Sequence, residues 1–495
     1  MKLPILILSL LSFASVASAA ELKFRLTADP ATLDWNLARS SHETHIIMNI
    51  MEGLVEEGPD LVVRPALAEK WEMSDEGKTY TFFLRPGVKW SDGRALRARD
   101  FIDSWTRLAS PKTGSSYANF LADMKSAKAV SDSKIIVTLK RPVPHFLHLL
   151  TFWVCFPVRL DLIQKYGKEW ATPGKLATLG PYLLFDWSHG RSIQLTRNAS
   201  YFGNAPQIDS VRAVIEPGDH KARELFEKGE LDFLLDATTG DLLKSHPAGT
   251  RVQQYPYLAT YYLGFNMRDR VLRNAEIRRA LSLAIDRSAI PGILQGGQVP
   301  AASFVPPGIA GHDPKLSLNG GLYEARGALV KAGFEEGKRF PKYVLLVEKF
   351  DGGEALGEWL AFTLREKLGV AVTARVASAQ EFQAAIKGHK ADLFVGHWGA
   401  DFPDASNFLE VFGSKSGTNP TGWKSSAYDA LLAKAASTTD SAARLAVLAQ
   451  AEKILVVDDV VILPLFYRKN AVLLGPKVKS FELSPLNYLF FKNLR

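Results

Sequence analysis

The sequence is almost free of cysteine: among its 495 residues, Cys155 stands alone. No disulfide can therefore form within the chain, which excludes the small disulfide-stapled scaffolds and leaves packing as the source of stability. Cys155 lies in the apolar stretch "TFWVCFPV", with no base beside it in the sequence. A thiol nucleophile needs such a base, so we expect a buried and unreactive cysteine.

The common catalytic signatures are also missing. The sequence contains no G-x-S-x-G, H-E-x-x-H, G-x-x-x-x-G-K-[ST] or G-x-G-x-x-G motif. His42 and His45 could share a helical face and bind a metal, but no third ligand accompanies them, and exposed histidines at a helix start are the alternative. Asp401 and Asp404 could act as an acid–base pair or could be solvated or capping carboxylates. We expect no enzyme, no cofactor and no metal site.

Long apolar runs are absent after the first twenty residues. There, Lys2 precedes "LPILILSLLSFASVA" and an A-x-A site at Ala17-Ser18-Ala19. This order is typical of a secretory signal, and the run is shorter than the roughly 20 residues that span a membrane. We expect cleavage after Ala19 or Ala20 and a soluble periplasmic protein. No cysteine stands at the cleavage site, so we expect no lipid anchor.

Neither basic nor acidic residues form a concentrated run along the sequence. The formal net charge is +8, but basic and acidic residues are interspersed along the chain. This pattern is typical of a solvated surface and argues against a nucleic-acid partner.

Strand and helix patterns alternate along most of the chain. Residues 340–395 read as strand, helix, strand, helix and strand, which predicts a parallel sheet covered by helices. Residues 56–179 have another texture, with strands such as "TYTFFL" between turns and the amphipathic stretch "ARDFIDSWTRLA", and they predict an inserted α+β subdomain. The fold class is therefore α/β with an insertion.

Several ordered segments resemble one family over essentially the whole chain after residue 20. These are "EGLV", "TYTFFLRPGVKWSDG", "GPYLLFDW", "LGFNMRD" before "IRRALSLAIDR", and finally "HWGADFPDASNFL". Together they resemble the periplasmic oligopeptide/dipeptide-binding proteins of ABC transporters. The resemblance implies a two-lobed periplasmic-binding-protein-like fold, with the α+β subdomain inserted in lobe I. Most of the long early signature is expected to be structural, including a buried Trp90. In the later stretch "IRRALSLAIDR", Arg278 and Arg279 are expected to brace neighbouring lobes and not to touch ligand.

The resemblance also implies ligand-binding residues. In the family, the W-x-x-D motif supplies an aspartate that pairs with the peptide's α-amino group, and here it is Asp401, with Trp398 as a wall of the pocket. A desolvated ammonium needs such a fixed anion, and an aromatic wall adds cation–π attraction. The backbone of His397, Trp398 and Gly399 is expected to pair with an extended peptide. A capping aspartate and a core tryptophan are the structural alternative.

At two further positions the chain can be compared with the family pattern: it matches the pattern at the first and departs from it at the second. Counting back from "MEGLV" places a glutamate of the opposite wall at Glu43, for which an exposed residue in a first helical turn is the alternative. Family members that prefer short peptides carry a basic residue early in the helix after "YVLLV", to meet the peptide carboxylate. This chain has Gly352, Gly353 and Glu354 there, and Lys349 is the nearest cation. The group that meets the carboxylate therefore stays unassigned, and a non-peptide ligand stays open.

The expected organisation has a signal segment, two lobes and an insertion. The expected boundaries are 1–20 for the signal; 21–55, 180–270 and 471–495 for lobe I; 56–179 for the insertion; and 271–470 for lobe II. The expected function is peptide capture between the lobes by a monomer and delivery to a membrane permease complex. The alternatives are a nickel chelate, haem or an opine-like conjugate as ligand, and, less favoured, a secreted hydrolase.

Overall fold

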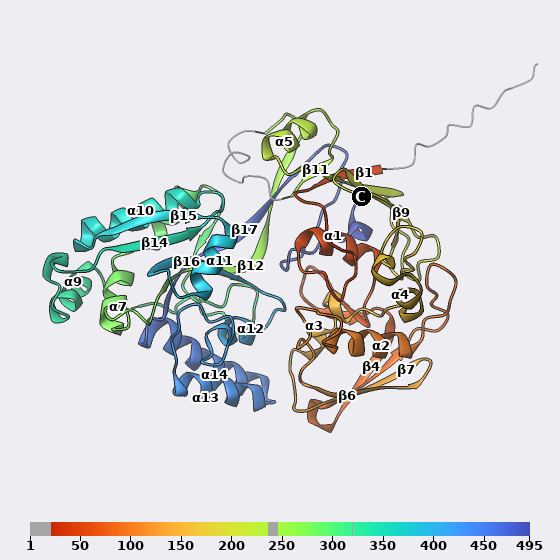
Figure 1. Cartoon of the computed structure of the whole chain (residues 1–495), viewed down its shortest axis with the longest axis horizontal. Helices are drawn as coiled ribbons and strands as arrows, with labels where there is room; N and C mark the ends of the chain where they lie inside the picture. The colour runs from red at the N-terminus through yellow and green to blue at the C-terminus, as the bar shows by residue number, and fades with distance from the viewer. Residues whose placement is uncertain (1–20, 236–245, 319) are drawn as a thin grey trace, which may run out of the picture.

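A computed structural model describes residues 21–235, 246–318 and 320–495. The predicted signal segment lies outside these residues. Figure 1 shows the elements gathered into two halves, one built around β1, α1, α2 and β6, the other around β14, α10 and α14. In the part of the chain that the structure describes, no helix is long and apolar enough to cross a membrane.

One large sheet runs through both halves. Its strand order is β15-β14-β16-β12-β17-β11-β1-β10-β9-β8, and β13 pairs with β17 beside this path. Its strands are β1 (Glu21–Leu26), β8 (Tyr182–Ser188), β9 (Ser192–Arg197), β10 (Ser210–Ile215), β11 (Phe233–Leu234), β12 (Arg251–Phe265), β13 (Val299–Pro300), β14 (Tyr343–Glu348), β15 (Val372–Ala377), β16 (Leu393–Gly399) and β17 (Ile462–Leu474).

The predicted parallel arrangement of residues 340–395 is confirmed, because β14 pairs in parallel with both β15 and β16. The other side of β16 pairs antiparallel with β12, so the sheet as a whole is mixed. The predicted insertion carries its own antiparallel sheet of β4 (Ala68–Ser74), β5 (Thr79–Leu84), β7 (Lys134–Leu139) and β6 (Met124–Ser131). A short pair, β2 (Val55–Glu57) and β3 (Val63–Pro65), precedes it.

The helices cover these sheets, and their ends follow local sequence signals. For example, Asp404 and Asp440 accept hydrogen bonds from backbone amides at two helix starts, and Gly369, with φ 69°, ends another in the left-handed region. The helices are α1 (Ser41–Ile50), α2 (Ala98–Ala109), α3 (Phe146–Leu149), α4 (Leu160–Tyr166), α5 (Asp219–Glu227), α7 (Ala275–Leu283), α8 (Ile290–Leu294), α9 (Leu322–Lys331), α10 (Gly353–Leu368), α11 (Ala379–Lys387), α12 (Ala405–Leu409), α13 (Ser426–Ser437) and α14 (Ser441–Lys453).

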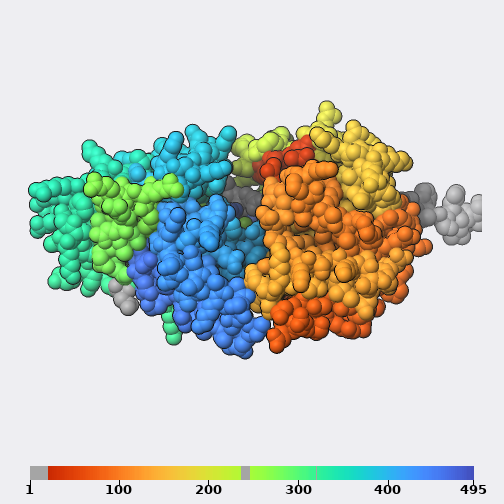
Figure 2. Space-filling model, turned by 60° about the horizontal axis from the view of Figure 1, so that its bottom comes forward, coloured from red at the N-terminus to blue at the C-terminus, as the bar shows by residue number. Residues whose placement is uncertain are grey.

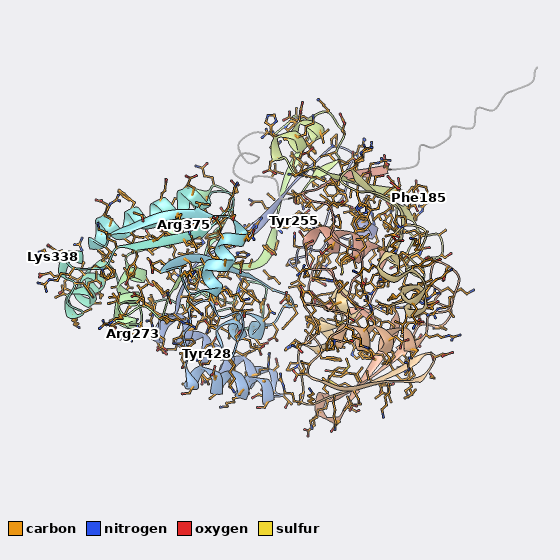
Figure 3. All side chains as sticks on the ribbon, viewed as in Figure 1. Phe185, Tyr255, Arg273, Lys338, Arg375 and Tyr428 are labelled. Atoms are coloured by element: carbon orange, nitrogen blue, oxygen red, sulfur yellow. The ribbon has the colours of Figure 1, made fainter. Side chains whose placement is uncertain are left out.

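Strands β12 and β17 join the two halves. The first part of β12 pairs with β17 where β17 also meets β11, and the last part pairs with both β17 and β16. The register between β12 and β17 shifts between Pro256 and Thr260, a β-bulge at the crossing. Tyr255, which Figure 3 labels near this crossing, is 9% exposed and donates its hydroxyl to the Phe481 carbonyl at 2.8 Å.

The halves also touch away from the crossing strands. The rings of His145 and Phe402 stack with centroids 4.4 Å apart, and Arg141 donates to the Ala436 carbonyl at 3.1 Å. Figure 2 shows the two halves meeting along a seam between the residues near 140 and those near 436. In this structure the two halves are therefore in contact at this seam as well as through the shared strands.

Several structural expectations are confirmed, and one is wrong. Trp90 and Cys155 are buried, at 1% and 2% exposure. Arg278 and Arg279, however, do not brace one lobe against another. Their guanidinium groups donate to the carbonyls of residues 457–460 and, for Arg278, also Leu272. They tie α7 to the segment just before β17 because the carbonyls at the end of the preceding helix need donors.

Candidate functional site

Trp398 and Asp401 lie at the carboxyl end of β16, where the strand leads into α12. Strand β16 extends to Gly399, so Trp398 belongs to the strand and Asp401 to the connection. Asn407, in α12, links the two: its Oδ1 accepts from Trp398 Nε1 at 2.9 Å and from the Asp401 backbone amide at 3.2 Å. A single buried amide thus fixes the indole and the carboxylate relative to each other.

The Asp401 carboxylate is partly buried and has no cationic partner among the described residues. Burial raises its pKa, and a side-chain hydrogen bond from Asn407 offsets this only in part. Within residues 21–235, 246–318 and 320–495, no lysine, arginine or histidine forms an ion pair with it. A desolvated carboxylate in this position attracts any cation that can enter.

Asp401 faces the other half of the molecule. Burial raises the pKa of Tyr117 to about 12, and the nearby charges of Asp401 and Glu43 contribute to the shift. Burial likewise raises the pKa of Tyr488, again with Asp401 contributing. Tyr117 belongs to the α+β insertion and Tyr488 to the C-terminal segment, so Asp401 lies where the two halves face each other.

Asp404, three residues further on, has a structural role. Its carboxylate binds the Arg444 guanidinium at 2.7 and 2.9 Å and caps α12 through the Ser406 amide. Burial opposes the charge, but the hydrogen bonds of Arg444 and the charges of His145 and Arg444 hold the pKa at about 2. An acid–base pair of Asp401 and Asp404 is therefore wrong, because Arg444 already neutralises Asp404.

The backbone next to Trp398 is half-paired. Residues His397, Trp398 and Gly399 pair with Tyr261, Thr260 and Ala259 of β12. On the opposite edge, the pairing of β14 with β16 ends at Val347 and Val395, and no strand of the described chain continues it. A Cβ at Gly399 would lie 2.9 Å from the Tyr257 hydroxyl, so a larger residue there would displace the end of that side chain.

His397 points into a concave region. Its ring stacks on Tyr261 with centroids 4.9 Å apart, and its Nδ1 lies 3.7 Å from a Glu348 carboxylate oxygen. Partial desolvation, with the charge of Arg468 added, lowers the pKa of His397 to about 4. The ring is therefore neutral at neutral pH.

Glu43 is buried, at 4% exposure, and so is not the exposed residue of the alternative interpretation. One of its carboxylate oxygens accepts from the Arg39 and Ser40 amides at 2.5 and 2.7 Å, forming a capping box at the start of α1. The histidines of α1 are not both exposed either, since His45 is 4% exposed. In the described ranges, no group of three or more histidine, cysteine, aspartate or glutamate residues could hold a metal.

Two cavities flank Trp398. One, of about 510 Å³, lies between β16, the end of β14 and α11, and includes His397 and Glu348. The other, of about 690 Å³, lies between Trp398 and α13. The sequence did not predict roles for Asn407 and Glu348. Asn407 lies within the candidate ligand-binding segment "HWGADFPDASNF", and Glu348 ends the predicted strand "YVLLVE".

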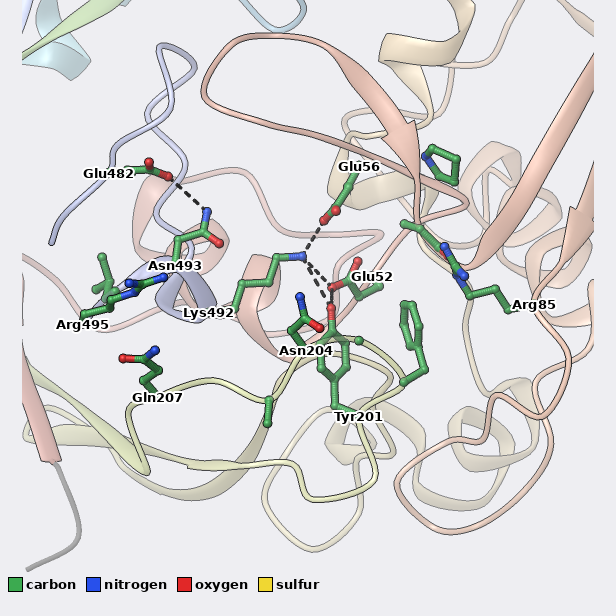
Figure 4. Close-up of a pocket in the computed structure, with 16 residues that line it drawn as sticks. Glu52, Glu56, Arg85, Tyr201, Asn204, Gln207, Glu482, Lys492, Asn493 and Arg495 are labelled. Carbon is green, nitrogen blue, oxygen red and sulfur yellow. Dashed lines mark hydrogen bonds and ion pairs between the residues drawn. The ribbon is translucent and has the colours of Figure 1, made fainter.

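A larger pocket of about 780 Å³ lies wholly in the first half (Figure 4). On its wall, Lys492 Nζ contacts Glu56 at 2.5 Å and Glu52 at 3.2 Å, and the Tyr201 hydroxyl donates to Glu52 at 2.5 Å. Burial opposes the charge of Lys492, but the two glutamates outweigh it and raise the pKa of the ammonium. Because these charges satisfy one another, we assign this cluster to anchoring the C-terminal segment.

Comparison with known proteins decides the family. Residues 62–420 match the model of the bacterial extracellular solute-binding proteins, family 5 (middle region). The chain belongs to this family. Family 5 proteins are solute-binding proteins, so the expectation of a non-enzyme and the resemblance found in the sequence are both confirmed.

Curated relatives of this family-5 chain match it over almost its whole length. The periplasmic oligopeptide-binding protein OppA of Salmonella typhimurium is 32% identical, over 99% of this chain and 97% of its own. The probable deoxycholate-binding periplasmic protein YgiS of Escherichia coli is 30% identical, over 94% of this chain and 92% of its own. The structure of the Escherichia coli murein tripeptide-binding protein MppA is 27% identical, with a TM-score of 0.81 over 97% of this chain and 98% of that chain. The two-lobed fold is thereby confirmed.

Proposed function

We propose that this protein is the soluble substrate-binding component of an ABC importer and that it captures peptides between its two lobes. The observation that carries the proposal is the Asp401 carboxylate, partly buried where it faces Tyr117 and Tyr488 of the other half, with no ion pair among the described residues. A peptide's α-ammonium supplies the missing charge, and the adjacent Trp398 keeps water away from the pair.

Main-chain pairing would hold the rest of the ligand. The unpaired edge of β16 at His397, Trp398 and Gly399 offers backbone donors and acceptors to an extended chain, whatever its side chains. Glu43, whose charge acts on Tyr117 together with that of Asp401, would lie in the opposite wall and add negative potential. Such a site recognises peptides by features that all peptides share.

The names of the relatives support a peptide but include another ligand. OppA and MppA are named for peptides, and YgiS for deoxycholate. Deoxycholate is itself an anion and carries no amine, so a buried aspartate would repel it. The geometry around Asp401 therefore favours a peptide over such an anion.

The cellular setting follows from the same proposal. Two of these relatives are named as periplasmic, and we place this protein in the periplasm as a monomer, after removal of residues 1–20, delivering its cargo to a membrane permease complex. We propose lobe I as 21–55, 180–270 and 471–495, the insertion as 56–179, and lobe II as 271–470. Closure would then turn about β12 and β17.

A calorimetric titration tests the amine recognition. Asp401→Ala should weaken the binding of a tetrapeptide at least about tenfold, and N-acetylation of the peptide should do the same to the wild type. Asp60→Ala, which removes an exposed aspartate paired with Arg64, is the matched control and should change nothing. Deoxycholate serves as the competing ligand.

Equal affinities for free and acetylated peptide, together with an unaffected Asp401→Ala variant, would remove Asp401 from the site. Tighter binding of deoxycholate than of any peptide would show that the ligand is not a peptide. Release of fragments from a labelled peptide would favour the hydrolase alternative.

A further inference from the structure

Glu348, which lines the same cavity as Trp398, is a second carboxylate without a cationic partner among the described residues. It is the last residue of β14, and its side chain is 19% exposed. Burial raises the pKa of this carboxyl group. The one contact recorded for the carboxylate is His397 Nδ1 at 3.7 Å, and that ring is neutral at neutral pH. Among the described residues, no positive charge therefore balances Glu348.

The cavity beside Glu348 has the shape and lining for a long side chain. It measures about 510 Å³, and Phe382, Ile386 and Phe394 contribute apolar surface along it. The only other formal charge that the described chain places on this wall is Lys387, which is exposed at the end of α11 and lies beyond 4.0 Å from any carboxylate. An alkyl stem against the apolar surface and a cationic head at Glu348 satisfy both parts of the cavity.

The register of the sheet places this cavity within reach of a bound peptide. Strand β14 stops pairing with β16 at Val395, so a ligand strand beside Gly396–Gly399 would occupy the position that β14 leaves. A peptide whose amino group meets Asp401 runs back along β16 toward Glu348. At about 3.3 Å per residue, its third residue or so comes level with Gly396.

We propose that this cavity, the Glu348 pocket, is a specificity site that receives a lysine or arginine side chain about three residues from the peptide's amino terminus. The proposal rests on the proposed peptide-binding function and deepens it. The protein would still accept many peptides through their backbones, and it would prefer those with a basic residue at this position.

Calorimetry with tetrapeptides that differ at one position tests the pocket. Tetra-alanine is compared with peptides carrying lysine at each position in turn, and with norleucine at the best position, which keeps the stem but not the charge. We expect one lysine position to tighten binding about tenfold over alanine. Glu348→Gln should remove this gain, whereas Glu366→Gln, at an exposed site, should keep it.

The outcomes separate this inference from the function on which it rests. If tetra-alanine binds and depends on Asp401, but lysine gives no gain over norleucine, only the Glu348 pocket is overturned. Survival of the lysine gain in a folded Glu348→Gln variant overturns it as well. Failure of every peptide to bind the wild type overturns both proposals.

Discussion

Asn407 shows how much of the site depends on one side chain. Its single carbonyl oxygen accepts hydrogen bonds from Trp398 and from the Asp401 amide, and its amide group reaches the Asp401 carboxylate. Asn407 is 8% exposed, so water replaces these bonds poorly. We regard it as a positioning residue, because it acts on a ligand only through its two neighbours.

Asn407→Ala should weaken tetrapeptide binding about tenfold, because Trp398 and Asp401 lose their common acceptor. The exposed Asn204→Ala is the matched control. The emission that Trp398→Phe removes belongs to this indole among the ten tryptophans, and it distinguishes positioning from a general loss of structure. We expect it to shift in Asn407→Ala while the melting temperature falls by only a few degrees. Unchanged affinity would show that the indole and carboxylate hold their places without Asn407.

At the residue scale, the sequence predicted where Trp398 and Asp401 lie but not what surrounds them. The strand pattern places Asp401 at a carboxyl strand end, whereas Tyr117 and Tyr488, which feel its charge from the other half, are far away in the sequence. The same limit applies to His45, expected at the surface and found at 4% exposure. Burial depends on which elements pack together, and a local pattern does not contain that information.

At the element scale, boundaries followed local signals well and strand lengths poorly. The stretch "ARDFIDSWTRLA" coincides with α2. Its apolar periodicity indicates the buried face of the helix, and Asp100 in the first turn indicates the N-terminal end. By contrast, the stretch of β17 contains "RKN" between two apolar runs, a pattern that favours two separate strands. The structure keeps it continuous, since Asn470 is buried and donates to Asn487 at 2.9 Å.

Glu452 ties helix α14 to the segment before residue 306. One of its carboxylate oxygens accepts from the Ser303 hydroxyl at 2.8 Å and from the Phe304 and Val305 amides at 2.7 and 2.8 Å. Burial raises the pKa of Glu452 to about 7, although these hydrogen bonds lower it. The folded protein therefore holds a proton here that the unfolded chain releases above about pH 4.5.

This linkage fixes the sign of a pH effect. Because the folded pKa is the higher one, the contribution of Glu452 to stability is fully present below about pH 4.5 and is lost as the pH rises through about 7, at up to roughly 1.4 kcal/mol per unit. Glu452→Gln, which keeps the accepting oxygen, should flatten the dependence in urea denaturation. Glu452→Ala should cost about 2–4 kcal/mol, because buried donors lose their acceptor.

An exposed control, Glu72→Gln, should leave the pH dependence of the free energy of unfolding as it is in the wild type. The assignment fails if Glu452→Gln keeps the wild-type slope between about pH 5 and 7. It also fails if Glu452→Ala unfolds at the same urea concentration as the wild type.

At the scale of the whole molecule, the contact between the halves contains a titratable group. His145, at the start of α3, stacks on Phe402, and its Nδ1 is buried without a hydrogen bond in the described structure. Burial lowers the pKa of His145 to about 4. The charged and titratable groups that face it are Asp404 and Arg444 from the opposite half and Arg141 and His148 from its own.

Separation of the halves would expose His145 and return its pKa to about 6.5. The closed form then binds fewer protons than the open form, so closure should weaken as the pH falls from about 6.5 toward 4. We expect small-angle scattering of the wild type to show a larger radius of gyration near pH 5 than near pH 7. His145→Phe keeps the stacked ring and should remove most of this difference.

His189, whose side chain is 69% exposed, provides the control: His189→Phe should respond to pH as the wild type does. A radius of gyration that is constant with pH in the wild type, or one that still changes in His145→Phe, would exclude His145 as the group that links closure to protons.

The overall fold was more predictable than the junction of its halves. The α/β class, the insertion and the two-lobed arrangement followed from element order and from the resemblance, because each element signals its own type. The sheet that both halves share could not be predicted, because the sequence of one strand does not indicate which distant strand it pairs with, as β12 does with β17 and β16.

That junction has an evolutionary consequence. Gly264 of β12 and Ile462 of β17 are direct partners in the sheet, so the chain leaves the common scaffold and re-enters it at adjoining points. Trp398, Asp401 and Glu348 all lie in the one stretch of chain between these partners, so a recombination event that exchanges this stretch replaces the three residues together. Cargo preference in such a lineage can diversify by swapping one module while the partner half keeps its surface.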